Sequence, residues 1–280
     1  MKTRMKICLT LALLLAVALI GCGFAAKPVP TPDVPAAAQG NDLSASVSAP
    51  APEESSPEIT IPKSLAPDLP DTKTVTVTTA DEFISAIDSN VTIRIDAALL
   101  DLSTATGYGE NFGSHWRWAQ EFDGPTLEIH DVENLRIIGG GRDVTTIQAV
   151  PRYADVLRFV NCKNLILADF TAGHLKEAPG SCSGMVLTFR SCSDVDIRLC
   201  GLFGCGVNGI VAEKSSKINV SDTEIYECSS LGAVLSECSE VAFDTCTVRD
   251  CGSNTILVYG TNGDCTWDGK VLKHGENKVG

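Results

Sequence analysis

Residues 187–197 read LTFRSCSDVDI, and a stretch with the same pattern occurs at four other places in the chain. Apolar or small side chains alternate with polar ones on both sides of Cys192, which is the period of a strand with one buried face. The equivalent stretches are LEIHDVENLRI at 127–137, LRFVNCKNLIL at 157–167, IVAEKSSKINV at 210–220 and AVLSECSEVAF at 233–243. Their starts lie 30 residues apart (157 − 127, 187 − 157) and then 23 apart (210 − 187, 233 − 210). The sequence therefore predicts five coils in register.

One coil cannot cover its own apolar face, so neighbouring coils must stack to share a core. Leu202, Ile225 and Val248 form a further column at the same spacing, and glycine or asparagine stands at the expected corners 206, 208, 209, 232, 252 and 254. Two or three short strands per coil predict an all-β fold, a right-handed parallel β-helix. A leucine-rich repeat also fits the spacing around Cys192, but the rest of each period is rich in Gly and β-branched residues, which favours a second strand over a helix.

On these residues, Thr74 to Tyr259 resembles the pectate-lyase-like β-helix superfamily, in particular its bacterial lipoproteins. The resemblance implies the fold and an N-terminal cap, which fits the capping box Thr79-Ala-Asp-Glu82 before a short amphipathic helix. It implies little about chemistry, because neither the paired aspartates of polygalacturonase-like hydrolases nor a lyase signature is visible.

The chain divides into three predicted parts: a lipoprotein signal peptide at 1–21, a lipidated tether at 22–73 and the β-helix domain at 74–280. Basic residues precede a short apolar run that ends at Ile20, which is typical of a secretory signal. Leu19-Ile20-Gly21-Cys22 resembles a lipobox, which implies lipidation of Cys22 and anchoring to the cell membrane on its extracytoplasmic face. The tether is rich in Pro, Ala and Ser, a composition that cannot build a core.

An insert at 103–124 breaks the repeat and is rich in aromatic residues. Aromatic faces on a loop of a rigid solenoid suit the apolar faces of sugar rings, and carboxylates suit sugar hydroxyls. The alternative is that these rings only pack the loop onto the coil wall. The insert's aromatic and charged residues are Tyr108, Glu110, Phe112, His115, Trp116, Arg117, Trp118, Glu121, Phe122 and Asp123.

The extra residues of the two long coils fall at 139–153 and 173–183, which we expect to be equivalent turns of neighbouring coils. If the aromatic insert folds over the same end, the three segments enclose a groove, the default location of a binding site. The two turns would contribute Arg142, Arg152, Tyr153, His174, Lys176 and Glu177.

If Leu127 and its equivalents face inward, the residues between them form rows on the outer surface. Neighbouring coils lie about 4.8 Å apart, so Glu128 should pair with Arg158, and Arg190 with Glu213. A surface ladder of ion pairs explains this pattern and would contribute little stability. In lyases that the sequence resembles, an outer Arg or Lys removes a proton beside a uronate carboxylate, often with calcium.

Two functional classes follow, with a purely structural spacer as the third. The first is a monomeric surface module that binds polysaccharide or another cell-envelope component without catalysis, through Tyr108, His115, Trp116, Trp118, Arg152, Tyr153, His174 and Glu177. The second is a polysaccharide lyase or glycoside hydrolase that uses Arg158, Arg190, Glu110, Glu121, Asp123 or Glu177 with His115 or His174. The lack of a complete catalytic motif favours the first class.

Twelve cysteines would ordinarily suggest a disulfide framework in a secreted protein. Here Cys162, Cys192 and Cys238 share one column and Cys205, Cys228 and Cys251 another, where parallel Cβ vectors disfavour disulfide geometry. We predict mostly free thiols, with Cys182 and Cys265 outside the columns and left open.

The net charge of −13 argues against nucleic acid as a partner. No CxxC pair or histidine cluster indicates a transition-metal site. We expect no cofactor, although calcium stays an alternative at acidic residues such as Asp194, Asp196 and Asp244.

Overall fold

The computed structural model of the protein describes residues 72–175, 183–204, 206–260 and 262–279. The predicted signal peptide, Cys22 and the tether up to residue 71 lie outside the described residues, as do Lys176, Glu177, Cys182 and Cys205. Within these described ranges, no helix is both long enough and apolar enough to cross a membrane.

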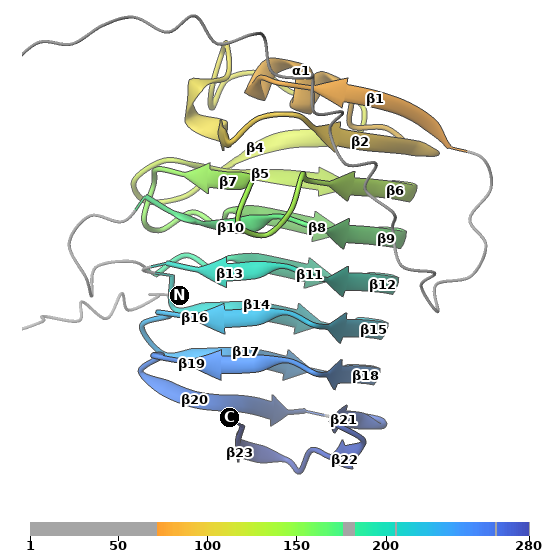
Figure 1. The fold of residues 1–280 in the computed structure, drawn as a ribbon, viewed down its shortest axis with the longest axis vertical. Coiled ribbons are helices and arrows are strands. Elements are labelled where there is room, and N and C mark those ends of the chain that lie inside the picture. Colours follow the sequence, from red (N-terminus) through yellow and green to blue (C-terminus); the bar gives the residue numbers. More distant parts are fainter. Residues whose placement is uncertain (1–71, 176–182, 205, 261, 280) are drawn as a thin grey trace, which may run out of the picture. The chain divides into compact units, whose positions relative to one another are not determined.

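The described chain winds through three sheets, one strand per sheet in each full coil (Figure 1). Sheet A is ordered β1 (Lys73–Val77), β2 (Val91–Ile95), β6 (Glu133–Ile138), β9 (Lys163–Ala168), β12 (Ser193–Arg198), β15 (Ser216–Ser221), β18 (Ser239–Asp244), β21 (Cys265–Trp267) and β22 (Lys270–Val271). Sheet B is ordered β19 (Thr247–Arg249), β16 (Glu224–Tyr226), β13 (Gly201–Phe203), β10 (Thr171–His174), β7 (Thr146–Ala149) and β3 (Leu99–Asp101). Sheet C is ordered β23 (Gly275–Lys278), β20 (Ser253–Tyr259), β17 (Leu231–Ser236), β14 (Asn208–Glu213), β11 (Leu187–Arg190), β8 (Leu157–Val160), β5 (Pro125–His130) and β4 (Trp116–Gln120).

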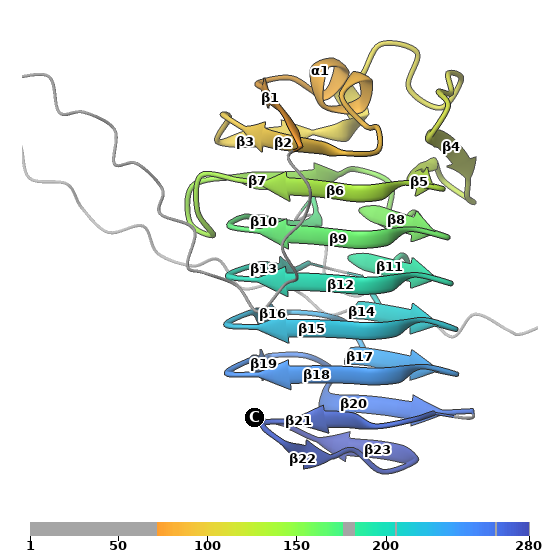
Figure 2. The same ribbon diagram turned by 90° about the vertical axis from the view of Figure 1, so that its right-hand side faces the viewer.

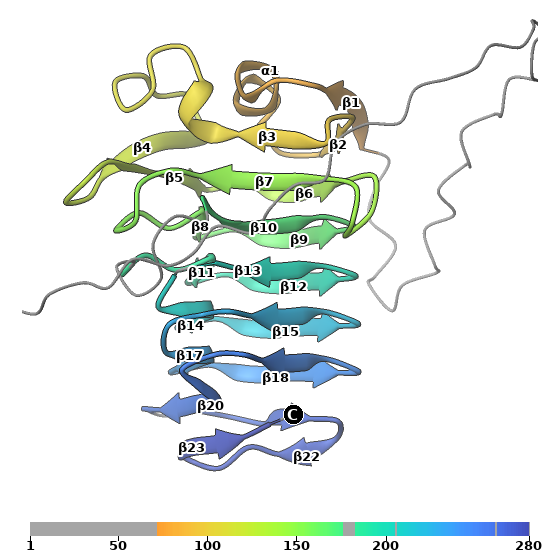
Figure 3. The ribbon, with the colours of Figure 1, turned by 60° about the vertical axis from the view of Figure 1, so that its left-hand side comes forward.

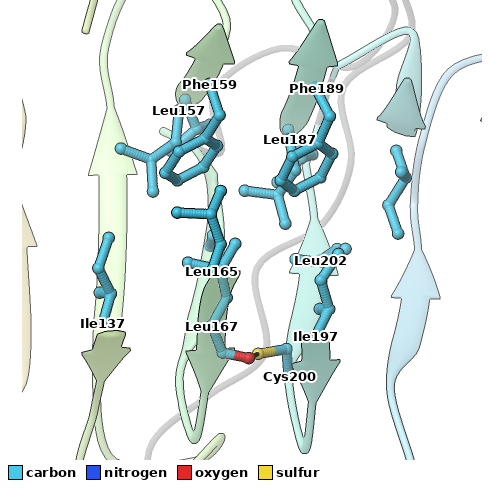
Figure 4. Close-up of a cluster of buried hydrophobic side chains, with 14 of the residues drawn as sticks. Ile137, Leu157, Phe159, Leu165, Leu167, Leu187, Phe189, Ile197, Cys200 and Leu202 are labelled. Atoms are coloured by element: carbon cyan, nitrogen blue, oxygen red, sulfur yellow. Dashed lines mark hydrogen bonds between the residues drawn. The ribbon is translucent and has the colours of Figure 1, made fainter. Parts of the chain in front are cut away.

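The parallel register confirms the predicted columns. In sheet C, Leu187 lies opposite Leu157 on one side and Ile210 on the other, and in sheet B Leu202 lies opposite Ile225. Figure 4 shows Phe159 and Phe189 side by side in the core, with ring centroids 5.3 Å apart. The core is therefore built by like residues stacking on like positions of the next coil.

The corners between sheets are formed mainly by non-glycine residues in the left-handed region. Asn161, Ser191, Lys214 and Glu237 occupy the same corner of successive coils with φ between 50° and 54°. At another left-handed position, Asn134 donates to Asn90 Oδ1 (2.7 Å) and Asn164 donates to Asn134 Oδ1 (3.0 Å). This asparagine ladder gives hydrogen-bond partners to side-chain amide groups near the start of β6 and β9 that would otherwise have none.

The N-terminal cap is confirmed. Thr79 and Glu82 form a reciprocal capping box for α1 (Ala80–Ser85), which buries Phe83 and Ile84. Figure 2 shows α1 above the first strands of the stack, where it covers the apolar end of the core. A short 3₁₀ helix, η1 (Leu102–Thr104), follows β3 and also buries its leucine.

A step of 23 residues places Asp264 and Thr266 at the next inward positions, so the sequence predicts that the register fails after Tyr259 and that the tail from Gly260 half-caps the last coil. The first of these predictions is wrong. β21 continues sheet A, where Cys265 pairs with Val241 and Trp267 with Phe243, so Cys265 lies in a core column and is 1% exposed. The step here is 24 residues (265 − 241), one more than in the preceding coils, and this extra residue displaced the predicted columns. β22 and β23 then pair antiparallel with β21 and β20 and cap the last coil, as the tail was expected to do.

The two long loops do not lie at equivalent turns, contrary to the prediction. In the first long coil the extra residues are at 139–145, between sheets A and B. In the second they follow β10, between sheets B and C. The two segments therefore emerge at different corners, and Figure 3 shows the loop before β7 at the A–B corner. The coil length alone could not show at which corner the extra residues lie, because the A–B and the B–C corner both come before the next alternating stretch of the sequence.

Candidate functional site

The aromatic insert returns to the solenoid as β4, which adds an antiparallel strand to the end of sheet C. Trp118 lies opposite Leu127 and is 8% exposed, so its ring faces the core side of the sheet. Tyr108 packs edge-on against Trp118 with centroids 4.7 Å apart. Burial, with help from the nearby carboxylates Asp101 and Asp123, raises the pKa of Tyr108 to about 12. Tyr108 and Trp118 therefore follow the alternative in which the rings of the insert pack onto the coil wall.

Beside this packed pair lies an open groove with a volume of about 470 Å³. Phe112 projects into solvent with 80% of its surface exposed, and Trp116 is half-buried. Glycine at position 113 lets the Trp116 ring lie close to the backbone, since a Cβ there would be 2.2 Å from Trp116 Nε1. The groove is lined by Gly109, Glu110, Asn111, Phe112, Gly113, Trp116, Arg117, Trp118 and His130.

The two histidines near the insert have different positions. His115, a predicted site residue, lies 3.4 Å from Asp88 and 3.3 Å from the His130 carbonyl oxygen, and it is not among the groove-lining residues. His130 lines the groove and contacts Asp131 at 2.9 Å. The alternating pattern of the first coil places His130 outward, but nothing in the sequence showed that the insert would return beside it.

A buried cluster of opposite charges lies along β4, β5 and β8. Arg158 contacts Asp155 (2.8 Å), Glu121 (2.7 Å) and Glu128 (3.7 Å), and Arg117 Nη2 contacts Glu128 at 2.6 Å. Arg158 and Glu128 are 8% and 4% exposed. The pairing of Glu128 with Arg158 was predicted correctly, but its description as a surface ladder was wrong, because Asp155 and the turn after β4 bring further carboxylates onto the arginine.

This cluster is ill suited to proton abstraction by Arg158. Burial alone lowers the pKa of Arg158, but Asp155 and Glu121 attract and hydrogen-bond the guanidinium, and the net direction is upward. A general base must give up its proton near the working pH, and an arginine whose pKa is raised cannot do so. The geometry therefore makes Arg158 a structural cation.

Arg190 remains a simple surface ion pair, as the ladder hypothesis predicted. Its guanidinium lies 3.2 Å from Glu213, and both side chains are nearly half exposed. Such a pair contributes little to stability and has no buried partner that would perturb its chemistry.

Asp123 and the segment 152–153 meet at the end of the insert. Asp123 accepts hydrogen bonds from the backbone N–H groups of Arg152 (2.7 Å) and Tyr153 (3.0 Å). Tyr153 packs against Phe122 with centroids 5.0 Å apart, and these rings are 44% and 86% exposed. The predicted residues Asp123, Arg152 and Tyr153 are thus brought together. They lie at the exposed ring pair of Phe122 and Tyr153, which is outside the groove lining.

His174 does not line a groove, contrary to the prediction. It is fully buried, with Nε2 2.7 Å from the Ala154 carbonyl oxygen, while Nδ1 has no hydrogen-bond partner among the residues that the structure describes. Burial lowers its pKa, despite the hydrogen bond to Ala154 and the charges of Asp155 and Asp123. The side chain turned inward because β10 ends at this residue and the next coil closes over it.

The described cysteines carry free thiols, and two of the acidic residues considered for calcium form ion pairs. All eight described cysteines are free thiols, which agrees with the prediction of mostly free thiols; Cys265, which was left open, is one of them. Asp194 contacts Lys217 (3.8 Å) and Asp196 contacts Arg198 (3.0 Å). In the part of the chain that the structure describes, no three His, Cys, Asp or Glu side chains come together as a metal site.

Comparison with known families agrees with this winding of parallel strands. The family model described as "right handed beta helix region" matches residues 168–274. The protein is a right-handed parallel β-helix. Within this β-helix, the groove lies beyond the matched residues, on the insert at the N-terminal end.

Other comparisons add little to the β-helix assignment. No curated protein matches the chain. A solved structure from Parabacteroides merdae ATCC 43184, a proposed glycosyl hydrolase, is similar with 10% identity and a TM-score of 0.40 over 70% of this chain and 98% of that one. A likeness this distant carries no argument about activity.

Proposed function

We propose that this β-helix binds polysaccharide, or another glycan of the cell envelope, in the groove beside β4 and does not cleave it. The observation that supports the proposal is the exposed Phe112 at the mouth of a groove that also contains Trp116, Arg117, Glu110 and His130. An exposed ring together with charged hydrogen-bonding groups suits a sugar, which has an apolar face and a rim of hydroxyls.

The scaffold favours binding without large rearrangement. The groove rests on Trp118 and Tyr108, which are packed against the core, and on β4, which is hydrogen-bonded along β5. A site held by such elements loses little conformational freedom when a ligand binds, so more of the contact energy appears as affinity.

Two of the catalytic candidates are unsuited to chemistry as placed. Arg158 is held by three carboxylates, and His174 is fully buried away from the groove. Glu110 lines the groove, but catalysis by a pair of carboxylates needs a second group across the bound sugar. The proposal therefore keeps the binding role and treats lyase or hydrolase activity as the outcome that would replace it.

The test uses the protein with Phe112→Ala and, as a matched control, Phe122→Ala. Phe122 is also an exposed phenylalanine of the same insert, but it does not line the groove. Retention on a panel of immobilised polysaccharides should fall at least ~10-fold for Phe112→Ala, corresponding to about 1.4 kcal/mol, and change little for Phe122→Ala. Equal losses in both variants would contradict the groove as the site. Release of unsaturated or reducing ends would contradict the absence of catalysis.

We also propose that the chain acts at the cell surface as a lipid-anchored monomer, with Cys22 as the acylated residue. The lipobox-like stretch before Cys22 supports this. Radiolabelled fatty acid should be incorporated into the protein and lost in Cys22→Ala, and absence of label in the unchanged protein would oppose the anchor.

A further inference from the structure

Cys228 and Cys251 are neighbours on two adjacent coils. In sheet B, Tyr226 of β16 lies opposite Arg249 of β19, so the cysteines two residues later occupy equivalent positions in the turn toward sheet C. The Gly252 N–H donates to the Cys228 carbonyl oxygen at 2.9 Å, which continues the alignment into the turn. Neighbouring strands lie about 4.8 Å apart, a Cα separation that a disulfide can span. The parallel Cβ vectors disfavour the bond in the resting chain, so closing it requires a small movement of the turn.

The two thiols differ in access. Cys228 is 2% exposed, whereas Cys251 is half-buried and reaches the surface. In the thiol form each sulfur contacts a backbone carbonyl oxygen, Cys228 that of Tyr226 (3.8 Å) and Cys251 that of Arg249 (3.4 Å). When Cys251 is the thiolate, the Cys228 thiol can donate to it. The accessible sulfur therefore has an inaccessible partner in contact with it.

The hydrogen bond changes the acidity of Cys251. Donation from the Cys228 thiol lowers the pKa of Cys251 to about 7, against the opposing effect of burial and of Asp250. The pKa of Cys228 is raised, first by this same hydrogen bond and then by burial. At neutral pH a large share of Cys251 is thus the reactive thiolate.

Cys246 and the pair of Cys162 and Cys192 show either surface access of the thiol or a neighbouring thiol, but not both. Cys246 is also half-buried, but its sulfur contacts the carbonyl oxygens of Val220 and Asp244, and burial raises its pKa to about 11. Cys162 and Cys192 occupy equivalent positions of neighbouring coils, but each is only 2% exposed and each sulfur contacts backbone carbonyl oxygens. Among these positions Cys251 combines surface access with a partner thiol.

We propose that Cys228 and Cys251 form a peroxide-reactive dithiol, with Cys251 as the attacking sulfur and Cys228 as the resolving one. The Cys251 thiolate attacks one oxygen of hydrogen peroxide and breaks the O–O bond, giving a sulfenic acid, while the departing hydroxide takes up a proton and becomes water. The Cys228 thiol then attacks that sulfur, its proton leaves with the hydroxyl as a second water, and a disulfide remains. The two thiols together lose two electrons and two protons, which reduce one peroxide to two waters.

The first measurement follows alkylation of the reduced full chain by iodoacetamide as a function of pH, with mass spectrometry of each cysteine peptide. Cys251 should react with a midpoint near pH 7, and at pH 7.5 at least ~100-fold faster than Cys246, because their thiolate fractions differ by more than that factor. Cys162 and Cys192 should stay unmodified until the protein is unfolded. Equal rates at Cys251 and Cys246 would overturn the proposal.

The second measurement treats the protein with one equivalent of hydrogen peroxide and digests it with trypsin, which cleaves after Arg249 and so separates the two cysteines. A cross-linked peptide pair that carries a Cys228–Cys251 disulfide should form and be released by dithiothreitol. Cys228→Ser should stop at a sulfenic acid on Cys251 that dimedone traps, and Cys251→Ser should give neither product. Formation of a Cys162–Cys192 disulfide at the same rate, or pairing of Cys228 with another cysteine, would overturn the assignment.

Discussion

At the scale of single residues, Arg158 shows how the same ion pair differs between the surface and the interior. Its replacement by Met would leave the buried carboxylate of Asp155 without its cation, while Glu128 would keep only Arg117. We expect the free energy of unfolding to fall by ~3–5 kcal/mol, the usual cost of breaking a buried pair by removing one partner. Urea denaturation followed by circular dichroism measures this change.

Arg190→Met is the matched control. It removes an arginine from the same sheet that pairs with Glu213 at 3.2 Å but is nearly half exposed. The expected loss is below ~1 kcal/mol, the range of exposed pairs. Similar losses of unfolding free energy in both variants would contradict this prediction and show that the ion pairs of Arg158 are as accessible to water as those on the surface.

His174 should make stability depend on pH. Burial lowers its pKa below the ordinary 6.5, so between these two values the unfolded chain binds a proton that the folded chain does not. Its contribution is complete above pH 6.5 and is lost as the pH falls from 6.5 toward the lowered folded pKa, with a limiting slope of about 1.4 kcal/mol per pH unit. Unfolding free energies at pH 8, 7, 6 and 5 measure it.

The His174→Gln variant separates the contribution of His174 to the pH dependence of stability from that of the carboxylates, which also take up protons as the pH falls. The amide can still donate toward the Ala154 carbonyl oxygen but has no proton to gain. The difference between the two proteins should therefore vary with pH between 8 and 5, and a constant difference would refute the assignment to His174.

At the scale of elements, the asparagine ladder stabilises the start of the sheet A strands β6 and β9, at left-handed positions that the strand register skips. Asn134 donates to Asn90 and accepts from Asn164, so Asn134→Ala breaks two hydrogen bonds at a position that is 9% exposed. We expect a loss of about 2 kcal/mol from these bonds, at roughly 1 kcal/mol each. Thermal or urea unfolding would measure it.

Lys217→Ala controls for the backbone. Lys217 occupies the same left-handed position two coils beyond Asn164, at φ 53°, but its side chain is exposed and outside the ladder. Both variants place alanine in the left-handed region, so their difference measures the ladder itself. No difference would mean that the asparagines are kept only for their backbone preference.

The corners between the sheets also mark the limit of prediction from the sequence. The strands were predictable because inward residues such as Leu157, Leu187 and Ile210 recur within the same alternating pattern, at steps of 30 and then 23 residues, and stacking demands such a repeat. The corners were not, because Ser191 and Glu237 adopt φ 53°, a conformation that neither residue prefers and that only the packed coil imposes.

At the scale of the whole molecule, the site was harder to predict than the stack. The insert was recognisable by composition, and Trp116 and Glu110 do line a groove. Which aromatic rings would be buried depended on β4 returning antiparallel beside β5, a long-range pairing with no local signal. The same pairing placed Arg117 on Glu128 and His130 in the groove, which the periodic pattern could not show.

The ends of the stack are the places where a second copy of the chain could pair with it. A solenoid of parallel strands exposes unpaired N–H and C=O groups at both ends, which can pair with a second copy. At the C-terminal end, β22 and β23 fold back antiparallel onto β21 and β20, and Val279 is buried at 8% exposure. Deletion of residues 269–280 should therefore uncover these edges and the base of the core, and cause self-association that increases with concentration.

Size-exclusion chromatography with light scattering tests this prediction, with the double variant Lys273→Ala, Glu276→Ala as the control. Both of these side chains are exposed, and β23 pairs with β20 through its backbone, so the control should keep the cap and elute as the unchanged protein does. A deleted chain that remains monomeric at every concentration would mean that the last coil protects its own edges. An associating control would instead assign solubility to the tail's charges, since charged residues on an edge also prevent pairing between copies.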